Sequence, residues 1–218
     1  MAMAERQIRL VVEAGGGDVK SFDELYEIYY KKVYALIRMV IGKPGEAEDI
    51  LQETFATAWR KLKTLDTPSS FPVWIQILAK NLCDMRIRKK SLAILLEADR
   101  DIDNIGGEET DELFPSAYAE RTDLYERFGK TIESLSDVQR QIIVLFYFND
   151  LSVDEISDVM GCSANTVKIR LFLARRAIFA EIAEQERKSG ETFIGAADMP
   201  TVPFRRVVNL FMDNLILN

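Results

Sequence analysis

Two segments of this chain combine cations with aromatic and amide side chains, a combination suited to binding nucleic acid. Residues 80–90 hold five cations against one acid, and residues 163–178 hold four cations and no acid. Lys and Arg bind phosphate oxygens through charge, whereas aromatic and amide groups hold unstacked bases or contact base edges. The chemistry indicated at both segments is therefore noncovalent binding of nucleic acid. The cations are Lys80, Arg86, Arg88, Lys89 and Lys90 in the first segment and Lys168, Arg170, Arg175 and Arg176 in the second.

The sequence lacks the usual residues of a catalytic or metal site. There is no histidine, and the two cysteines, Cys83 and Cys162, are far apart. These facts exclude His-dependent catalysis and the usual Cys/His zinc patterns. The glycines at residues 15–17 lack the Gly-Lys-Ser/Thr that completes a phosphate-binding loop. We expect a protein that is not an enzyme and that has no cofactor, no metal and no small-molecule substrate; a helical enzyme is the least supported alternative.

An acidic stretch separates the two basic segments. The net charge of the chain is −7, and residues 97–126 hold eleven acids against two arginines. Because binding to DNA depends on the local patch, the total charge does not exclude a DNA partner. No apolar run approaches the roughly 20 residues that cross a bilayer, and the first ten residues are charged. We therefore expect a cytoplasmic protein with no membrane insertion.

The elements that must position these residues are predicted to be helices. Apolar residues recur at three- and four-residue spacing along most of the chain, which predicts an all-α fold. Ser followed three residues later by Glu or Gln, the pattern of a capping box, marks helix starts at Ser21, Ser136 and Ser152. The predicted helices span residues 5–14, 22–40, 46–62, 70–90, 124–134, 136–148, 152–160 and 163–185, and residues 207–216 could form a last one.

Composition divides the chain into two small helical domains. Residues 96–122 are acidic and contain Gly106, Gly107 and Pro115, so they are predicted to form a flexible linker. We expect domains at residues 1–95 and 123–186, the linker at 96–122, and a C-terminal extension at 187–218.

The strongest local pattern is a predicted helix-turn-helix at residues 151–176. A short capped helix is followed by Gly161, which can adopt a positive φ, and by a longer helix capped by Ser163. Side chains near the start of such a second helix reach base edges, and cations along it contact phosphates. The alternative is a plain helical hairpin with a solvated basic face. The candidate DNA-binding residues are Ser163, Asn165, Thr166, Lys168, Arg170, Phe172, Arg175 and Arg176.

Two helices of the first domain carry further candidate surfaces. The helix at residues 70–90 mixes Phe71 and Trp74 with amide and basic residues, which suits unstacked bases. Alternatively, its aromatic residues are core and its basic end is a solvated terminus. In the preceding helix, Glu46, Asp49 and Glu53 share one face because they are three and four residues apart. This acidic face suits a basic protein partner, and the alternative is an ordinary solvated face.

Several short motifs follow one another along residues 5–186. They are Asp23-Glu24-Leu25-Tyr26, Ala47-Glu48-Asp49-Ile50-Leu51-Gln52-Glu53-Thr54-Phe55, Ser70-Phe71 with Trp74 and Asn81, Leu135-Ser136, Gln139-Arg140, Met160-Gly161-Cys162, Thr166-Val167-Lys168 and Ala174-Arg175-Arg176. In this order they resemble the extracytoplasmic-function (ECF) subfamily of bacterial RNA polymerase sigma factors. The resemblance implies a factor that binds core RNA polymerase and directs promoter-specific transcription initiation.

The resemblance also implies a role for each candidate surface. Asp49, Gln52, Glu53 and Phe55 would bind the polymerase. The minus-ten element would be captured by Asp66, Ser70, Phe71, Trp74, Lys80, Asn81, Arg86, Arg88, Lys89 and Lys90. The helix that begins after Ser163 would enter the major groove at the minus-thirty-five element. The implied partners are core RNA polymerase, promoter DNA and an anti-sigma factor.

Some features depart from the family pattern or lie outside it. Asn165, Ile169 and Phe172 stand where small or polar residues are common, and Phe172 either contacts a thymine methyl group or packs inward. Residues 187–218 lie outside the resemblance, and they either restrain the two domains or form a frayed terminus. The main alternative function is a stand-alone helix-turn-helix regulator of transcription, which leaves the acidic helix and the aromatic–basic helix unexplained.

Overall fold

The computed structural model describes residues 2–98, 131–132 and 134–189, and the chain divides into two compact units, Met1–Leu113 and Phe114–Asn218. Every regular element in the described residues is helical, which confirms the all-α prediction. The first unit holds α1 (Ala2–Gly15), α2 (Val19–Ile41), α3 (Pro44–Lys61), η1 (Leu62–Thr64), η2 (Pro68–Ser70) and α4 (Phe71–Ala98). The second holds α6 (Asp137–Ile143), η3 (Val144–Phe148), α7 (Val153–Met160) and α8 (Ala164–Ser189).

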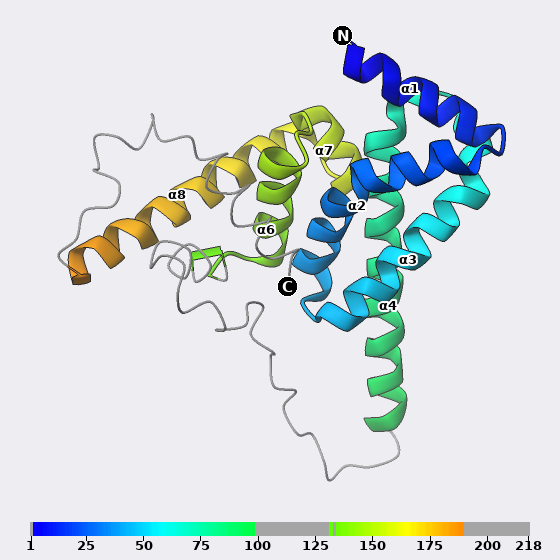
Figure 1. Cartoon of the computed structure of the whole chain (residues 1–218). Coiled ribbons are helices and arrows are strands. Elements are labelled where there is room, and N and C mark those ends of the chain that lie inside the picture. The colour runs from blue at the N-terminus through cyan, green and yellow to red at the C-terminus, as the bar shows by residue number, and fades with distance from the viewer. Residues whose placement is uncertain (1, 99–130, 133, 190–218) are drawn as a thin grey trace. The chain divides into compact units, whose positions relative to one another are not determined.

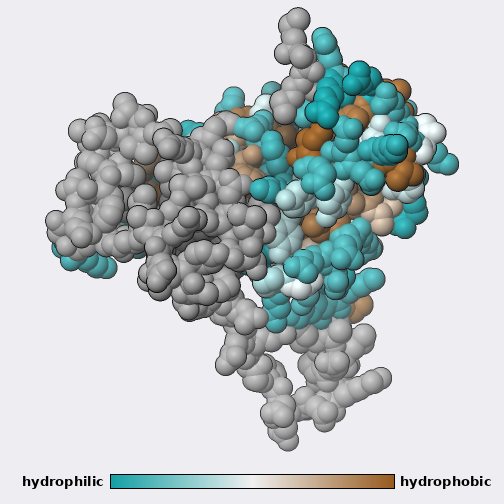
Figure 2. Space-filling model, viewed as in Figure 1, coloured by the Kyte–Doolittle hydropathy of each residue, from teal (hydrophilic) through white to brown (hydrophobic). Residues whose placement is uncertain are grey.

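The first unit is built on α2, α3 and α4, which pack against one another in all three pairs, while α1 packs on α2. Each helix buries an apolar stripe whose members recur at three- and four-residue spacing. The fully buried core includes Leu25, Leu36, Ile37, Ile50, Phe71 and Ile75. Figure 2 shows that the visible described surface of this unit is mainly hydrophilic, with hydrophobic residues in separate small groups.

The start of α2 differs from the predicted capping box at Ser21. The helix begins at Val19, and its N-cap is Asp18, whose carboxylate accepts a hydrogen bond of 2.8 Å from the Ser21 backbone N–H. Hydrogen bonding to Ser21 also lowers the pKa of Asp18. The Ser21 hydroxyl instead donates to Glu13 of α1 at 2.8 Å. The prediction was wrong because an aspartate three residues earlier provides an equally good cap, and Ser21 is left to join two helices.

A tight turn joins α2 to α3, as the sequence predicts. Gly42 ends α2 with φ 77°, a region that glycine enters without steric cost, and its N–H donates to the Arg38 carbonyl at 3.0 Å. Pro44 then occupies the first turn of α3, where its missing N–H has no helical partner to lose. This short turn brings α3 back against α2, and the two helices pack together.

Helix α4 is longer than predicted. It continues to Ala98 instead of ending near residue 90, because residues 91–98 contain good helix formers and no Gly or Pro. Figure 1 shows that its C-terminal part extends beyond α2 and α3. The described side chains of residues 87–92 are all exposed, so this part of α4 is open to a partner along its length.

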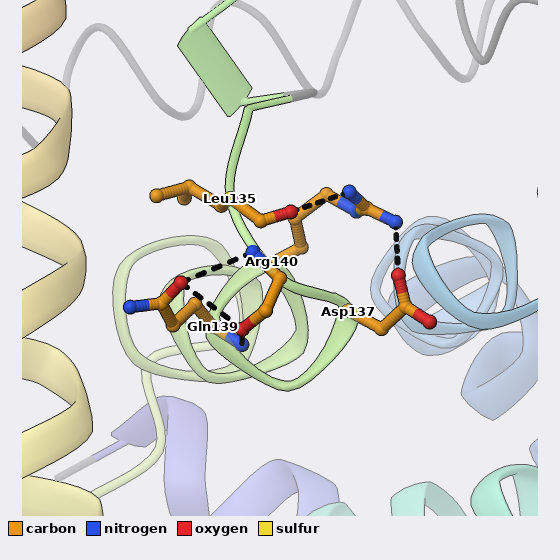
Figure 3. Close-up of polar contacts among 5 residues, drawn as sticks. Leu135, Asp137, Gln139 and Arg140 are labelled. Atoms are coloured by element: carbon orange, nitrogen blue, oxygen red, sulfur yellow. Dashed lines mark hydrogen bonds and ion pairs between the residues drawn. The ribbon is translucent and has the colours of Figure 1, made fainter.

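In the second unit, α6 begins with the predicted capping box at Ser136 (Figure 3). The Gln139 amide oxygen accepts from the Ser136 backbone N–H at 3.0 Å, and the Gln139 N–H donates back to the Ser136 hydroxyl. Arg140 donates to the Leu135 carbonyl at 2.7 Å and also to the Asp137 carboxylate. The Gln139-Arg140 pair therefore fixes how the chain enters α6.

The predicted helix-turn-helix is present as α7, a turn and α8. Ser152 and Glu155 form a second capping box, with the Ser152 N–H donating to the Glu155 carboxylate at 2.7 Å. Gly161 ends α7 in the left-handed region, with φ 61° and ψ 37°. Helices α7 and α8 pack through Ile156, Val159, Val167 and Leu171, all of which are buried. Helix α8 also packs on α6, so the second unit has its own core.

The remaining predictions concern residues that the structure does not describe. These are residues 99–122 of the acidic linker, most of the predicted helix at 124–134, and residues 190–218 of the C-terminal extension.

Candidate nucleic-acid interface

The outward face of α8 carries a continuous line of exposed side chains. Its members, which recur at three- and four-residue spacing and which we call the α8 stripe, are Asn165, Lys168, Ile169, Phe172, Leu173 and Arg176. The opposite face of the helix, with Val167, Leu171, Ala174 and Ile178, is buried. The helix is therefore held by one face and free to contact a partner with the other.

The first turn of α8 is open to an anionic or hydrogen-bonding ligand. Ser163 is the N-cap, and its hydroxyl accepts the Thr166 N–H at 3.1 Å and lies 2.8 Å from the Thr166 hydroxyl. Asn165 is exposed beside them. Free N–H groups and the positive end of the helix dipole favour a phosphate at this position. The structure thus brings Ser163, Asn165 and Thr166 together, as the sequence predicts.

Two of the predicted DNA-binding arginines in α8 point partly into the protein. The Arg175 guanidinium lies over the rings of Phe146 and Tyr147, at 5.5 Å and 5.3 Å from their centroids. Arg170 is half-buried and lies 3.9 Å from the Cys162 sulfur. The cation–π contact holds Arg175 against these rings. Of the four predicted DNA-binding cations of α8, Lys168 and Arg176 are the two that are exposed.

The aromatic residues at the start of α4 divide into buried and accessible members. Phe71 is completely buried and packs edge-on against Tyr29, with 5.2 Å between ring centroids. It therefore cannot stack on a base, which corrects its predicted role. Trp74 is half-buried and lies 5.8 Å from the Phe71 ring, so its outer surface stays available. Phe71 supports Trp74 from behind.

Seven-residue spacing places Trp74, Asn81 and Arg88 on one side of α4. Asn81 and Arg88 are exposed, and Arg88 also donates to the Asp84 carbonyl at 3.3 Å. Lys80 lies beside this line, and its ammonium contacts both carboxylate oxygens of Asp84 at 2.8 Å. The line offers an aromatic ring, an amide and a guanidinium in sequence along the helix, and Arg86, Lys89 and Lys90 add positive charge near its end.

The loop before α4 lies at the start of this line. Asp66 is exposed between η1 and η2, and the Ser70 hydroxyl donates to the Thr67 carbonyl at 2.6 Å. Pro68 occupies the first position of η2, where its fixed φ suits the start of a helical turn. The loop residues Asp66 and Ser70 therefore lie next to the end of α4 that carries Trp74, while Arg86 and Lys90 point to other sides of the helix than Asn81 and Arg88.

The predicted acidic face of α3 is exposed at Asp49 and Glu53 and half-buried at Glu46, and of the four predicted polymerase-binding residues only Phe55 is buried. Asp49, Gln52 and Glu53 are exposed on α3. Phe55 is 4% exposed and packs against Tyr26, with 4.6 Å between ring centroids, and against Phe22. Phe55 is therefore a core residue that supports the acidic face from within.

Two features of the candidate surfaces were missed by reading the sequence. Asp84 is the partner of Lys80, and its four-residue spacing could have revealed it. Leu173 is part of the exposed α8 stripe, which only the tertiary packing of α8 shows. Within the described residues no group of acids and cysteines could hold a metal ion. Among those residues, too, no helix has both the length and the hydropathy needed to span a bilayer.

Comparison with known proteins covers both units. Residues 25–92 match the family described as Sigma-70 region 2, and residues 125–178 match Sigma-70 region 4. The ECF RNA polymerase sigma factor SigW of Bacillus subtilis is 30% identical over 191 residues, covering 84% of this chain and 98% of that protein. The chain belongs to the ECF sigma factors. The ECF sigma-E factor of Escherichia coli K12 is also 30% identical, over 78% of this chain and 90% of its own length.

Solved structures agree on the fold of this ECF sigma factor. The sigma factor RpoE of Bartonella quintana, solved with the anti-sigma factor NepR, has a TM-score of 0.60 at 24% identity and covers 76% of this chain and 98% of that one. CnrH, solved with the cytosolic domain of CnrY, has a TM-score of 0.57 at 22% identity and covers 82% of this chain and 98% of that one. The family matches at both units mean that the chain is a sigma factor that directs transcription initiation, and a stand-alone regulator is not favoured.

Proposed function

We propose that this sigma factor acts through three surfaces, one that binds core RNA polymerase and two that bind promoter DNA, and that it has no catalytic role. The observation that carries the proposal is that two separate helices, α4 and α8, each expose cations together with groups that can contact bases. A protein that bound only duplex DNA would need only the surface of α8. A factor that holds both an unpaired and a paired element needs both helices.

The polymerase-binding surface is proposed to be the exposed acidic face of α3. Asp49, Gln52 and Glu53 supply charge and hydrogen-bonding groups for a basic partner surface. Phe55 acts indirectly, because its ring is buried against Tyr26 and holds α3 in position on α2. Residues 1–95 form the domain that carries this surface.

The minus-ten surface is proposed to run from the loop at Asp66 and Ser70 along α4. Trp74 stacks on a base that has left the duplex, and Asn81 hydrogen-bonds to it or to a neighbour. Arg86, Arg88, Lys89 and Lys90 bind the backbone of the same strand. Lys80 is tied to Asp84 in the free protein, so it binds DNA only if it leaves that ion pair.

The minus-thirty-five surface is proposed to be the first turns of α8, carried by the domain at residues 123–186. Ser163, Asn165 and Thr166 lie where helix N-termini contact bases and phosphates. Lys168 and Arg176 are exposed and bind phosphates on either side of the groove. Arg175 holds α8 against η3, and Arg170 is half-buried beside Cys162 in the turn before α8.

The partners and the location of the protein follow from this role. Core RNA polymerase is in the cytoplasm of bacteria, so we place the factor there. An anti-sigma factor is a further proposed partner, since the sigma factor RpoE of Bartonella quintana, which has the same fold, was solved with one. The linker predicted at residues 96–122, whose first three residues belong to the end of α4, is proposed to join the two domains, and residues 187–218 follow the second.

Run-off transcription tests the proposal. Core RNA polymerase, with and without the full chain, is supplied with a library of templates whose upstream region is randomised. Transcripts that depend on the protein and share a two-part upstream sequence support the three-surface proposal. Tight duplex binding by the protein alone, without any dependent transcript, contradicts it and favours a stand-alone regulator. The same library yields the two promoter elements for every later measurement.

A further inference from the structure

The α8 stripe is polar at its two ends and apolar in the middle. Asn165 and Lys168 stand at its N-terminal end and Arg176 at its C-terminal end. Between them Ile169, Phe172 and Leu173 are 52%, 62% and 44% exposed. Three large apolar side chains in adjacent turns leave a continuous apolar ridge in water, which is an unfavourable arrangement unless a partner covers it.

This ridge does not contribute to the core of the second unit. The core side of α8 is already filled by Val167, Leu171, Ala174 and Ile178, each at most 4% exposed. Ile169 and Phe172 lie on the opposite side, so the structure decides between the two readings of Phe172: it does not pack inward. The ridge is available to whatever α8 binds.

The position of the ridge along α8 matches the reach of a recognition helix. Ile169 is five residues after Ala164, the first residue of the helix, which is about 7.5 Å along the axis. Phe172 is nearly one turn further along. Recognition helices contact base edges through their first turns, so Ile169 falls within the base-contacting part and Phe172 at its end.

The apolar group that a major groove offers is the C5-methyl group of thymine; the other exposed base-edge groups there are hydrogen-bond donors or acceptors. We propose that Ile169, together with Phe172, contacts thymine methyl groups in the minus-thirty-five element, and that this contact makes the factor prefer thymine at one or two positions of that element. Lys168 and Arg176 stand at the two ends of the ridge and bind phosphates. These contacts hold the major groove against the ridge. The inference rests on the proposed role of α8 and adds the base that it selects.

Uracil is the matched probe, because it differs from thymine only by that methyl group and keeps the same hydrogen-bonding groups. Holoenzyme made from core polymerase and the full chain is bound to synthetic promoter duplexes in which each thymine of the selected minus-thirty-five element is replaced in turn by uracil. At one or two positions we expect binding to weaken about fourfold, as for one methyl group removed from an apolar contact. With Ile169→Ala the thymine and uracil duplexes should bind within about 1.5-fold of each other.

The control variant is Lys168→Ala. It removes a phosphate-binding cation one residue away, so it should weaken thymine and uracil duplexes equally and keep the roughly fourfold ratio between them. Ile169 is exposed, so Ile169→Ala should fold normally. If it does not, Ile169→Ser is a second variant, and it should likewise bind thymine and uracil duplexes with nearly equal affinity.

The outcomes separate this inference from the proposed function. If transcription and promoter binding are normal but every thymine-to-uracil change leaves binding unaltered, the methyl contact is wrong and the role of α8 stands. A selected element without thymine leads to the same conclusion. A holoenzyme that shows no sequence-dependent binding at all contradicts the proposed function itself. A third outcome is that Ile169→Ala changes the oligomeric state while the unaltered protein binds thymine and uracil duplexes equally. The ridge is then an interface between copies of the chain, and the inference is overturned.

Discussion

The guanidinium of Arg175 lies over the ring of Tyr147, with its central carbon 5.3 Å from the ring centroid. Its neighbour Arg176 is exposed on the α8 stripe. Two consecutive arginines on the same helix therefore have different roles. Arg175 holds α8 on η3, and Arg176 is exposed to solvent, where we propose that it binds DNA.

Replacing each arginine separately tests this division. Arg175→Ala should lower the free energy of unfolding of the second unit by about 1–2 kcal/mol, since a partly desolvated cation–π contact and its packing are lost. Arg176→Ala should leave stability unchanged and reduce the slope of log affinity against log salt by about one. Urea unfolding and promoter binding at several salt concentrations measure both effects. Equal effects of the two variants on stability would contradict the assignment.

The helix boundaries that the sequence predicts well are those set by neighbouring residues alone. Ser136 with Gln139 and Ser152 with Glu155 form capping boxes because every partner lies within one turn. Ser21 has the same local pattern but joins α2 to α1, because Asp18 is nearby and Glu13 approaches from another helix. That choice depends on tertiary contact, which a local pattern does not contain.

The candidate site shows the same limit. Spacing along α3 and α8 places Asp49, Glu53 and Lys168 on exposed faces, where the structure has them. Spacing does not show that Phe71 is buried and Trp74 is accessible, because both fall near one stripe of α4. The position of Tyr29 on α2 decides which ring is covered. The burial of Phe55 has the same cause, since its neighbours come from α2.

The acidic face of α3 gives a prediction with a matched core variant. Asp49→Ala should weaken binding of core RNA polymerase by about tenfold, as expected when a residue central to an interface is truncated, and should leave the fold intact. Phe55→Ala should instead lower the free energy of unfolding by about 3–5 kcal/mol, because a buried ring is lost. Core binding is measured by titration of labelled protein. Normal binding by folded Asp49→Ala would remove α3 from the interface.

Trp74 is predicted to be the base-stacking residue of α4. Trp74→Ala should weaken binding of the single-stranded minus-ten oligonucleotide by holoenzyme by about 1–3 kcal/mol, the usual worth of one stacked base. Trp59 is the matched control, because it is also a partly exposed tryptophan but lies on α3, against Phe22. Trp59→Ala should leave oligonucleotide affinity unchanged. An equal loss in both variants would point to a general effect of removing a tryptophan.

The two cysteines are predicted to differ in reactivity. Cys83 is completely buried on α4, and burial raises the pKa of its thiol to about 12, whereas Cys162 is partly exposed in the turn before α8. A thiol reagent at pH 8 should therefore modify one cysteine of the folded protein, and both after unfolding. Cys162→Ser should abolish the reaction of the folded protein. Fast modification of that variant would show that α4 opens at this position.

Burial of Cys83 and Tyr29 also predicts loss of stability in alkali. Burial raises the pKa of Cys83 from about 9 and that of Tyr29 from about 10, in each case to about 12. The folded state thus keeps these protons longer than the unfolded state does. Their stabilising contribution is complete below pH 9 and is lost as the pH rises toward 12. Urea unfolding at pH 8 and pH 10.5 should show the decline, and Cys83→Ala should reduce its size.

Replacement by alanine should change stability in opposite directions at two glycines that differ in backbone conformation. Gly161 ends α7 at φ 61°, where an alanine is strained even though nothing lies within 4 Å of the added Cβ, so Gly161→Ala should destabilise the second unit by about 1 kcal/mol. Gly45 lies in the first turn of α3, also with open space around it, and Gly45→Ala should stabilise the first unit by about 0.4–1 kcal/mol.

Thermal unfolding of both variants and of Gly161→Asn completes the test. Asparagine tolerates the left-handed region better than alanine, so it should recover part of the loss at residue 161. A Gly161→Ala variant as stable as the parent would show that the turn between α7 and α8 can take another conformation without cost. The orientation of α8 would then not depend on this glycine, and the angle at which α8 meets DNA would have to be set by the packing of Val167 and Leu171 alone.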